Sequence, residues 1–299
     1  MNRVTEQETD PPLRRNWMDA PARDEHDDQA SPHQAQSAIQ RWTDSAWRLT
    51  ALPLLLLFAI PIVALLMRTT PALLLENLNK EQVVQAIGVS LRTTTISLVV
   101  TILLGMPVAY LMGRRQFRFK RFVDTLIDLP MVMPPSVAGV ALLITFGRKG
   151  AIGGALESLG VQVAFTQIAV IIAQVFISAP FFVRAASLGF AAVDNEIEQA
   201  AHLDGAGRWQ VFRYIIMPLS QYPLISGSTM SWARALGEFG ATMIFAGNLP
   251  GLTQTMPTAI YLGFEVDLDV ALTLSVILLL ISFVSIWIVK SFAGRQEIS

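Results

Sequence analysis

The sequence contains no cysteine, which excludes a disulfide framework, a thiolate metal site and a cysteine nucleophile. It has only three histidines, and none is paired with another at helical spacing, so we expect solvated side chains rather than metal ligands. Charged residues make up only 15% of the 299 residues, whereas hydrophobic residues make up 53% and the mean hydropathy is +0.48. A soluble domain of this length is less apolar, so the sequence predicts an integral membrane protein.

Motifs for catalysis are also lacking. No Gly-x-x-x-x-Gly-Lys-Ser/Thr phosphate loop is present, and the glycine-rich run 147–154 has the wrong order of residues. We find no clustered ligands and no nucleophile near a base. We therefore expect no catalytic residues, no cofactor bound by this chain and no nucleic-acid partner.

The first 45 residues are rich in Asp, Glu, Gln, Pro and Arg and carry no apolar period, which predicts a disordered cytoplasmic tail. No secretory signal is expected, because the first apolar run begins near Leu49. Residues 46–293 form the predicted transmembrane domain. Its six candidate spans, each long enough to cross about 30 Å of hydrocarbon as a helix, are Leu49–Met67, Gly88–Met112, Thr125–Phe146, Thr166–Ser187, Pro218–Phe245 and Val270–Val289.

Basic residues near the span ends predict the orientation, since Lys and Arg resist translocation. They concentrate after the second and fourth spans, at Arg114–Arg121 and at Arg208 and Arg213, and near both ends of the chain. The opposite loops are poorer in basic residues, and 246–269 has none. Both termini are therefore expected in the cytoplasm. The Arg114–Arg121 cluster has a second interpretation, an anchor for lipid headgroups.

A polar segment, 194–215, interrupts the apolar chain between the fourth and fifth spans. Asp194 or Asn195 can cap a short helix there, and Gly205 and Gly207 end it. Trp209, Val211 and Phe212 offer apolar contact. Physical reasoning alone leaves two interpretations, a partner-binding loop and an interfacial helix that lies flat on the membrane.

The spacing of this segment resembles the EAA motif of permease subunits of bacterial ATP-binding-cassette (ABC) importers, in which Glu-Ala-Ala, three residues, Gly, nine residues and Ile-x-Leu-Pro follow one another. Gln199 replaces the Glu of the motif and Met217 replaces its Leu. The resemblance implies a coupling helix that inserts into a cleft of the ATPase subunit. The candidate coupling residues are Glu198, Gln199, Ala200, Ala201, Asp204, Gly205, Ala206 and Pro218.

Two further motifs lie within predicted spans. Arg234 and Glu238 are four residues apart in the fifth span, so they can pair on one helix face. They could line a pathway or fix helix packing. Pro130, Pro134 and Pro135 disturb the third span, where Pro134 and Ser136 are candidates for a gate and the alternative is a kinked helix without moving parts.

Three short sequence segments extend the resemblance to the molybdate permeases among these importers and to the related sulfate permeases. They are 129–139, 234–242 and 245–255. The resemblance covers about residues 48–290 and implies an all-α type I importer permease with six transmembrane helices and a cytoplasmic coupling helix. Molybdate is the first expected substrate, tungstate the second and sulfate the third.

The implied partners are a cytoplasmic ATPase that binds ATP and Mg²⁺, a periplasmic or extracellular oxyanion-binding protein, a second copy of this chain and membrane lipid. Alternating access at a two-fold pore in the plasma membrane is the implied mechanism. A secondary transporter is the rival class, but it would need ion-coupling carboxylates, and Glu238 is the only acidic residue expected at mid-membrane.

Overall fold

The computed structural model describes residues 32–293, in which every regular element is a helix. The chain divides into two units, Met1–Pro61 and Ile62–Ser299, which are described separately. Helix α1 (Pro32–Arg68) contains the first predicted span. The predicted end of the tail at residue 45 falls inside this helix, whereas residues 1–31 lie outside the described part.

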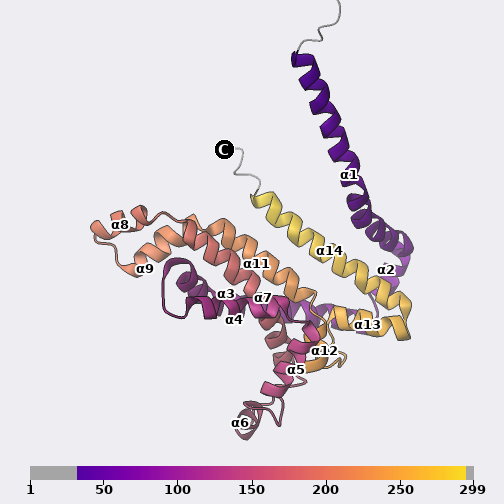
Figure 1. Cartoon of the computed structure of the whole chain (residues 1–299). Helices are drawn as coiled ribbons and strands as arrows, with labels where there is room; N and C mark the ends of the chain where they lie inside the picture. Colours follow the sequence, from indigo (N-terminus) through magenta and orange to yellow (C-terminus); the bar gives the residue numbers. More distant parts are fainter. Residues whose placement is uncertain (1–31, 294–299) are drawn as a thin grey trace, which may run out of the picture. The chain divides into compact units, whose positions relative to one another are not determined.

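Three helices of the second unit pack against one another: α3 (Glu81–Arg114), α7 (Gln167–Ala192) and α11 (Gln221–Leu236) (Figure 1). Small and hydroxyl residues allow the close approach of α3 and α7. A Cβ on Gly105 would lie 3.0 Å from the ring of Phe182, and Ser97 Oγ donates a hydrogen bond of 2.9 Å to Gln174 Oε1. These contacts make α3, α7 and α11 the closely packed centre of the unit.

A second group combines α2 (Pro71–Asn77), α13 (Met256–Val266) and α14 (Leu268–Ala293). Asn77 Nδ2 donates a 2.9 Å hydrogen bond to Thr273 Oγ1 of α14.

The predicted external loop 246–269 is not a simple loop, because it contains α13. Met256 and Ala259 of α13 are buried in an apolar cluster with residues of α3, α11 and α14, and this burial explains the helix.

The third predicted span, Thr125–Phe146, is not one straight helix. It consists of α4 (Lys120–Val132) and α5 (Pro135–Phe146), which meet at a bend of 115°. Pro134 and Pro135 have no backbone N–H, so the helical hydrogen bonds cannot continue through them. The expected proline break is thus confirmed, and α6 (Gly153–Ser158) follows α5.

The fifth predicted span, Pro218–Phe245, is also not continuous. After α10 (Met217–Leu219) and α11, the helix ends at Leu236, and a short α12 (Gly240–Phe245) begins after three intervening residues. Gly237 and Gly240 flank this break, where glycine lowers the cost of leaving the helix. In the described part, four helices are long and apolar enough to cross a membrane, or five if the bent pair counts as one span. The prediction of a membrane protein is confirmed, while the count of six is not.

Candidate functional site

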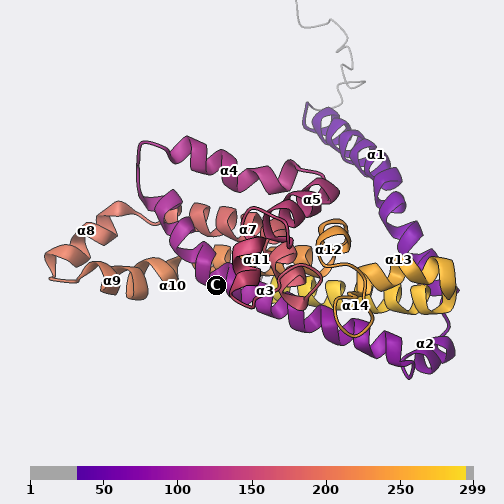
Figure 2. The same cartoon turned by 90° about the horizontal axis from the view of Figure 1, so that it is seen from below.

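The polar segment between α7 and α11 forms α8 (Asn195–Leu203) and α9 (Arg208–Val211), which lie beyond the ends of α3 and α7 (Figures 1 and 2). Asp194 caps α8, since its side chain accepts a 2.9 Å hydrogen bond from the Glu196 N–H. This is the cap that the sequence predicts. The segment 194–207, which is the larger part of the segment 194–215 for which a coupling role is expected, is called the coupling segment below.

Gly205 ends α8 as predicted. Its φ of +87° lies in the left-handed region that favours glycine, and the Ala206 N–H donates to the Ala201 carbonyl at 2.9 Å to close the turn. No atom of the described chain lies within 4 Å of a Cβ built on Gly205. The glycine is therefore required by the backbone turn, and the space beside it is open to a partner.

The candidate coupling residues fall into two groups. Gln199, Ala200, Asp204 and Gly205 are exposed, together with the large apolar side chains of Ile197 and Leu203. Ala201 and Ala206 are half-buried against an apolar cluster of α3, α7 and α9. One face of α8 is thus free for contact and the other attaches it to the rest of the unit.

Glu198 belongs to the attached face, where it forms an ion pair with Arg114 at the end of α3. The Arg114 side chain is 5% exposed, and its Nη1 also donates a 2.7 Å hydrogen bond to the Val193 carbonyl at the end of α7. Arg114 therefore joins two long helices to α8. In the sequence Arg114 is only a signal of orientation, and its contact with Glu198 was not predicted because the two partners are 84 residues apart.

The expected apolar contacts after the glycines are partly wrong. Val211 is buried and Phe212 half-buried in the chain's own cluster with Phe190, so neither is free for a partner. Trp209 is exposed but lies beside Phe212, with ring centroids 5.6 Å apart. Exposed apolar contact comes instead from Ile197 and Leu203.

A π-helical turn, η2 (Phe212–Ile216), precedes Pro218. The Met217 N–H donates to the carbonyl of Phe212, five residues earlier, rather than to the residue four earlier. Such a wide turn fits the chain ahead of a proline, which removes one donor and crowds the preceding turn. Pro218 is exposed and lies in α10, so it shapes the passage from the coupling segment into α11.

The second candidate site is the break between α11 and α12. Arg234 Nη1 lies 2.9 Å from Glu238 Oε2, although the two residues are not on one continuous helix as predicted. Glu238 is 1% exposed, and its Oε1 accepts a 2.9 Å hydrogen bond from the Ala241 N–H, which caps α12. The Arg234 side chain is 32% exposed. Glu238 thus stabilises the break, and Arg234 is the accessible member of the pair.

The bend between α4 and α5 lies against this break. A Cβ on Gly240 would be 2.8 Å from Pro135 Cβ, and a Cβ on Gly139 would be 3.0 Å from the Ala241 backbone. Pro134 and Ser136 are both exposed. The structure therefore brings the bend that contains the predicted gate residues against the start of α12, which Glu238 caps.

A further ion cluster escaped the sequence analysis. Arg184 of α7 donates from Nη1 to Asp124 Oδ1 at 2.6 Å and pairs with both oxygens of Asp128, so two carboxylates of α4 hold one guanidinium. Asp128 lies inside the third predicted span, so Glu238 is not the only acidic residue within the predicted spans. The spacing of Asp124 and Asp128 by four residues was the available signal.

The comparisons with known proteins identify the class. The family model described as the inner membrane component of binding-protein-dependent transport systems matches residues 102–297, which is more than half of the chain. The chain belongs to this family and is a membrane permease of the ABC importer class.

Individual relatives agree with this class. The chain is 37% identical over 244 residues to the molybdenum transport system permease ModB of Mycobacterium tuberculosis, covering 82% of this chain and 91% of that protein. It is 42% identical over 195 residues to the putative molybdenum permease YvgM of Bacillus subtilis (65% and 86%). It is 34% identical over 222 residues to a probable sulfate permease, cysT, of Chlorokybus atmophyticus (73% and 78%).

A solved structure has the same fold. It is a bacterial alginate ABC transporter in complex with a periplasmic protein that holds an alginate pentasaccharide, with a TM-score of 0.71 at 17% identity, covering 87% of this chain and 96% of that chain. The all-helical importer architecture expected from the sequence is thereby confirmed. The likeness concerns the fold alone.

Proposed function

We propose that this chain is the permease subunit of a molybdate importer of the plasma membrane, driven by ATP hydrolysis in a separate ATPase subunit. The coupling role is supported by the exposed face of the coupling segment, which combines Ile197, Leu203 and the open space at Gly205. This face docks on the cytoplasmic ATPase, which holds ATP and Mg²⁺, and both termini are cytoplasmic. This chain binds no cofactor.

A chain with one coupling segment serves one ATPase subunit, so two copies form the pore around a two-fold axis. An extracytoplasmic binding protein delivers the oxyanion. In the pore, Arg234 is the residue proposed to attract the anion, because its guanidinium is partly exposed while its ion-pair partner Glu238 is buried and also accepts a hydrogen bond from the Ala241 N–H. Ser136 and Pro134 form the neighbouring wall.

Molybdate is supported by the names of two relatives, and sulfate is the second candidate because a sulfate permease is also a relative at 34% identity. Tungstate follows molybdate, since the two oxyanions are nearly equal in size. The deciding experiment reconstitutes the permease with its ATPase in a bilayer and measures ATP hydrolysis with the binding protein and each anion. Stimulation by molybdate and tungstate alone supports the proposal, stimulation by sulfate selects the second candidate, and absence of any complex with an ATPase contradicts both.

Docking is tested by Leu203→Asp, which places a charge on the exposed face without disturbing the core. We expect this variant to lose association with the ATPase while its membrane insertion is unchanged. Leu159→Asp is the matched control, since Leu159 is also an exposed leucine but follows α6, outside the coupling segment. Equal association of both variants with the ATPase would contradict docking at α8.

A further inference from the structure

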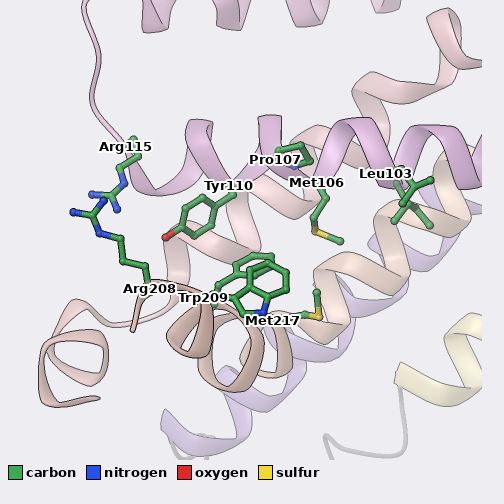
Figure 3. Close-up of a pocket in the computed structure, with 10 residues that line it drawn as sticks. Leu103, Met106, Pro107, Tyr110, Arg115, Arg208, Trp209 and Met217 are labelled. Carbon is green, nitrogen blue, oxygen red and sulfur yellow. The ribbon is translucent and has the colours of Figure 1, made fainter. Parts of the chain in front are cut away.

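A pocket of about 760 Å³ lies between α3 and the segment from α9 to α10 (Figure 3). Its wall is apolar, formed by Leu103, Met106 and Pro107 of α3 and by Trp209 and Met217 opposite. Arg115 and Arg208 stand together at one end of the pocket, and Figure 3 shows their guanidinium groups side by side. The pocket thus has a long apolar part and a strongly positive mouth.

Neither guanidinium is neutralised within the described part of the chain. Arg115 and Arg208 are exposed, and no ion pair or hydrogen bond of their side chains occurs among the described residues. Arg114 and Arg184 differ in this respect, since Arg114 is paired with Glu198 and Arg184 with two aspartates. Two adjacent positive charges without a carboxylate favour an anionic group between them.

The position of the pocket on α3 indicates where that anion comes from. Leu103 and Met106 lie within the second predicted span, where hydrocarbon is expected, whereas Arg115 directly follows the last residue of α3. Leu103 is 67% exposed, so the apolar part is open to its surroundings. An occupant with an acyl chain at one end and a negative headgroup at the other matches both parts.

We propose that this pocket is a binding site for an anionic phospholipid, with the phosphate between Arg115 and Arg208 and one acyl chain along Met106, Leu103 and Met217. The two arginines come from different segments, so the lipid connects the end of α3 to α9, directly after the coupling segment. The site goes beyond the proposed transport function and does not depend on which anion is carried.

Native mass spectrometry of the purified permease, with its ATPase where the two co-purify, tests the proposal after incubation with equal amounts of phosphatidylglycerol and phosphatidylcholine. Wild type is expected to retain mainly phosphatidylglycerol. Arg115→Gln combined with Arg208→Gln should reduce this retention by about 25-fold, because one basic residue near a membrane surface contributes about five-fold. Equal retention of the two lipids by wild type would overturn the proposal.

The matched control combines Arg118→Gln with Arg213→Gln. It removes the same charge from the same two segments, but both arginines lie outside the pocket, beside Phe119 and Tyr214. A smaller loss than in the pocket variant supports the site, whereas an equal loss would mean that only general surface charge attracts the lipid and would overturn it.

A photoreactive benzophenone amino acid in place of Leu103 identifies the occupant independently of the arginines. In native membranes, a product linked to phosphatidylglycerol or another anionic lipid supports the proposal. A product linked to a second copy of the chain, to another segment of the same chain or to the ATPase would overturn it, because the pocket would then be a protein interface.

Discussion

The two candidate sites each contain an arginine–glutamate pair, and the pairs differ in what they join. Arg114 and Glu198 are 84 residues apart and connect α3 to the coupling segment, whereas Arg234 and Glu238 are four residues apart and span a break in one segment. In the first pair the arginine is buried, with 5% of its side chain exposed, and in the second pair the glutamate is buried, at 1%.

Because a different partner is buried in each pair, the two pairs have different structural roles. A buried arginine with a carbonyl and a carboxylate as partners holds α8 in place and exposes no charge. A buried glutamate that caps α12 leaves the arginine accessible at the break. The same two residue types therefore hold α8 in place at one site and leave a partly exposed guanidinium at the other, and variants should separate these roles.

The largest loss of stability is expected from Arg234→Ala. Removing one partner of a buried ion pair costs about 3–5 kcal/mol, because the remaining charge stays buried, and the partial exposure of Arg234 places the cost toward the lower value. Thermal unfolding in detergent should show the loss, and transport should fall with it. Arg148→Ala is the control, since its partner Glu157 is 3.6 Å away and both side chains are exposed. A stable and fully active Arg234→Ala variant would show that the pair is dispensable.

Arg114→Gln should cost about 2–3 kcal/mol, since it removes an ion pair and a charged hydrogen bond to the Val193 carbonyl. Amide hydrogen exchange should become faster in α8 and remain unchanged in α14. Glu198→Gln should have the smaller effect, because the amide oxygen still accepts a hydrogen bond from Arg114. If exchange in α8 is equal in all three proteins, the pair does not hold the coupling segment.

Two substitutions of Gly205 distinguish an effect on ATPase docking from an effect on stability. Gly205→Ala should destabilise by about 1–2 kcal/mol through its positive φ alone, since the added Cβ meets no atom within 4 Å. Gly205→Asp has no larger backbone cost, since Asp tolerates a positive φ better than Ala, and it adds a charged group at the proposed ATPase contact, so we expect it to abolish coupled transport while insertion is intact. Gly207→Ala is the control, because Gly207 has a φ of −72°. Normal uptake by Gly205→Asp would contradict the coupling assignment.

The sequence was sufficient where structure is set by neighbours in the chain. The Asp194 cap, the end of α8 at Gly205 and the break at Pro134–Pro135 depend on the conformational preferences of single residues, and each is confirmed. The spacing of the EAA motif predicts a coupling role for the segment that contains α8, and this role stays a prediction.

The features that the sequence did not reveal depend on contacts between residues that are far apart in the chain. The contact of Arg114 with Glu198 and the clamp of Arg184 by Asp124 and Asp128 join different helices, and a single sequence gives no measure of such distances. The break after Leu236 was missed because the segment 218–245 is apolar enough to look like one helix, although Glu238 stabilises a separate α12. Helix α13 was missed for a related reason, since it is stabilised by burial against α14.

A third ion pair, between Lys80 and Asp267, is an example of a weak contact that is largely exposed to solvent. Its atoms are 2.9 Å apart, but the side chains are 42% and 40% exposed, so its contribution is a few tenths of a kcal/mol. The hydrogen bond from Lys80 lowers the pKa of Asp267 below its ordinary value of 3.8. A carboxyl with a lowered pKa contributes stability above about pH 4 and loses it as the pH falls through the lowered pKa.

Asp267→Asn isolates this charge, because Asn can still accept the N–H bonds that Asp267 Oδ1 receives from Asp269 and Val270. The variant should melt slightly below wild type at pH 7 and low salt, and the difference should shrink in high salt and toward pH 3. Glu157→Gln, in the more open pair with Arg148, should not shift the melting temperature at any pH. If the difference in melting temperature between Asp267→Asn and wild type grew as the pH fell, its sign would be opposite to that expected for a carboxyl with a lowered pKa. The effect would then come from the helix cap and not from the charge. A small effect here, beside larger effects of Arg114→Gln and Arg234→Ala, would agree with the greater burial and the additional hydrogen bonds of the pairs at the candidate sites.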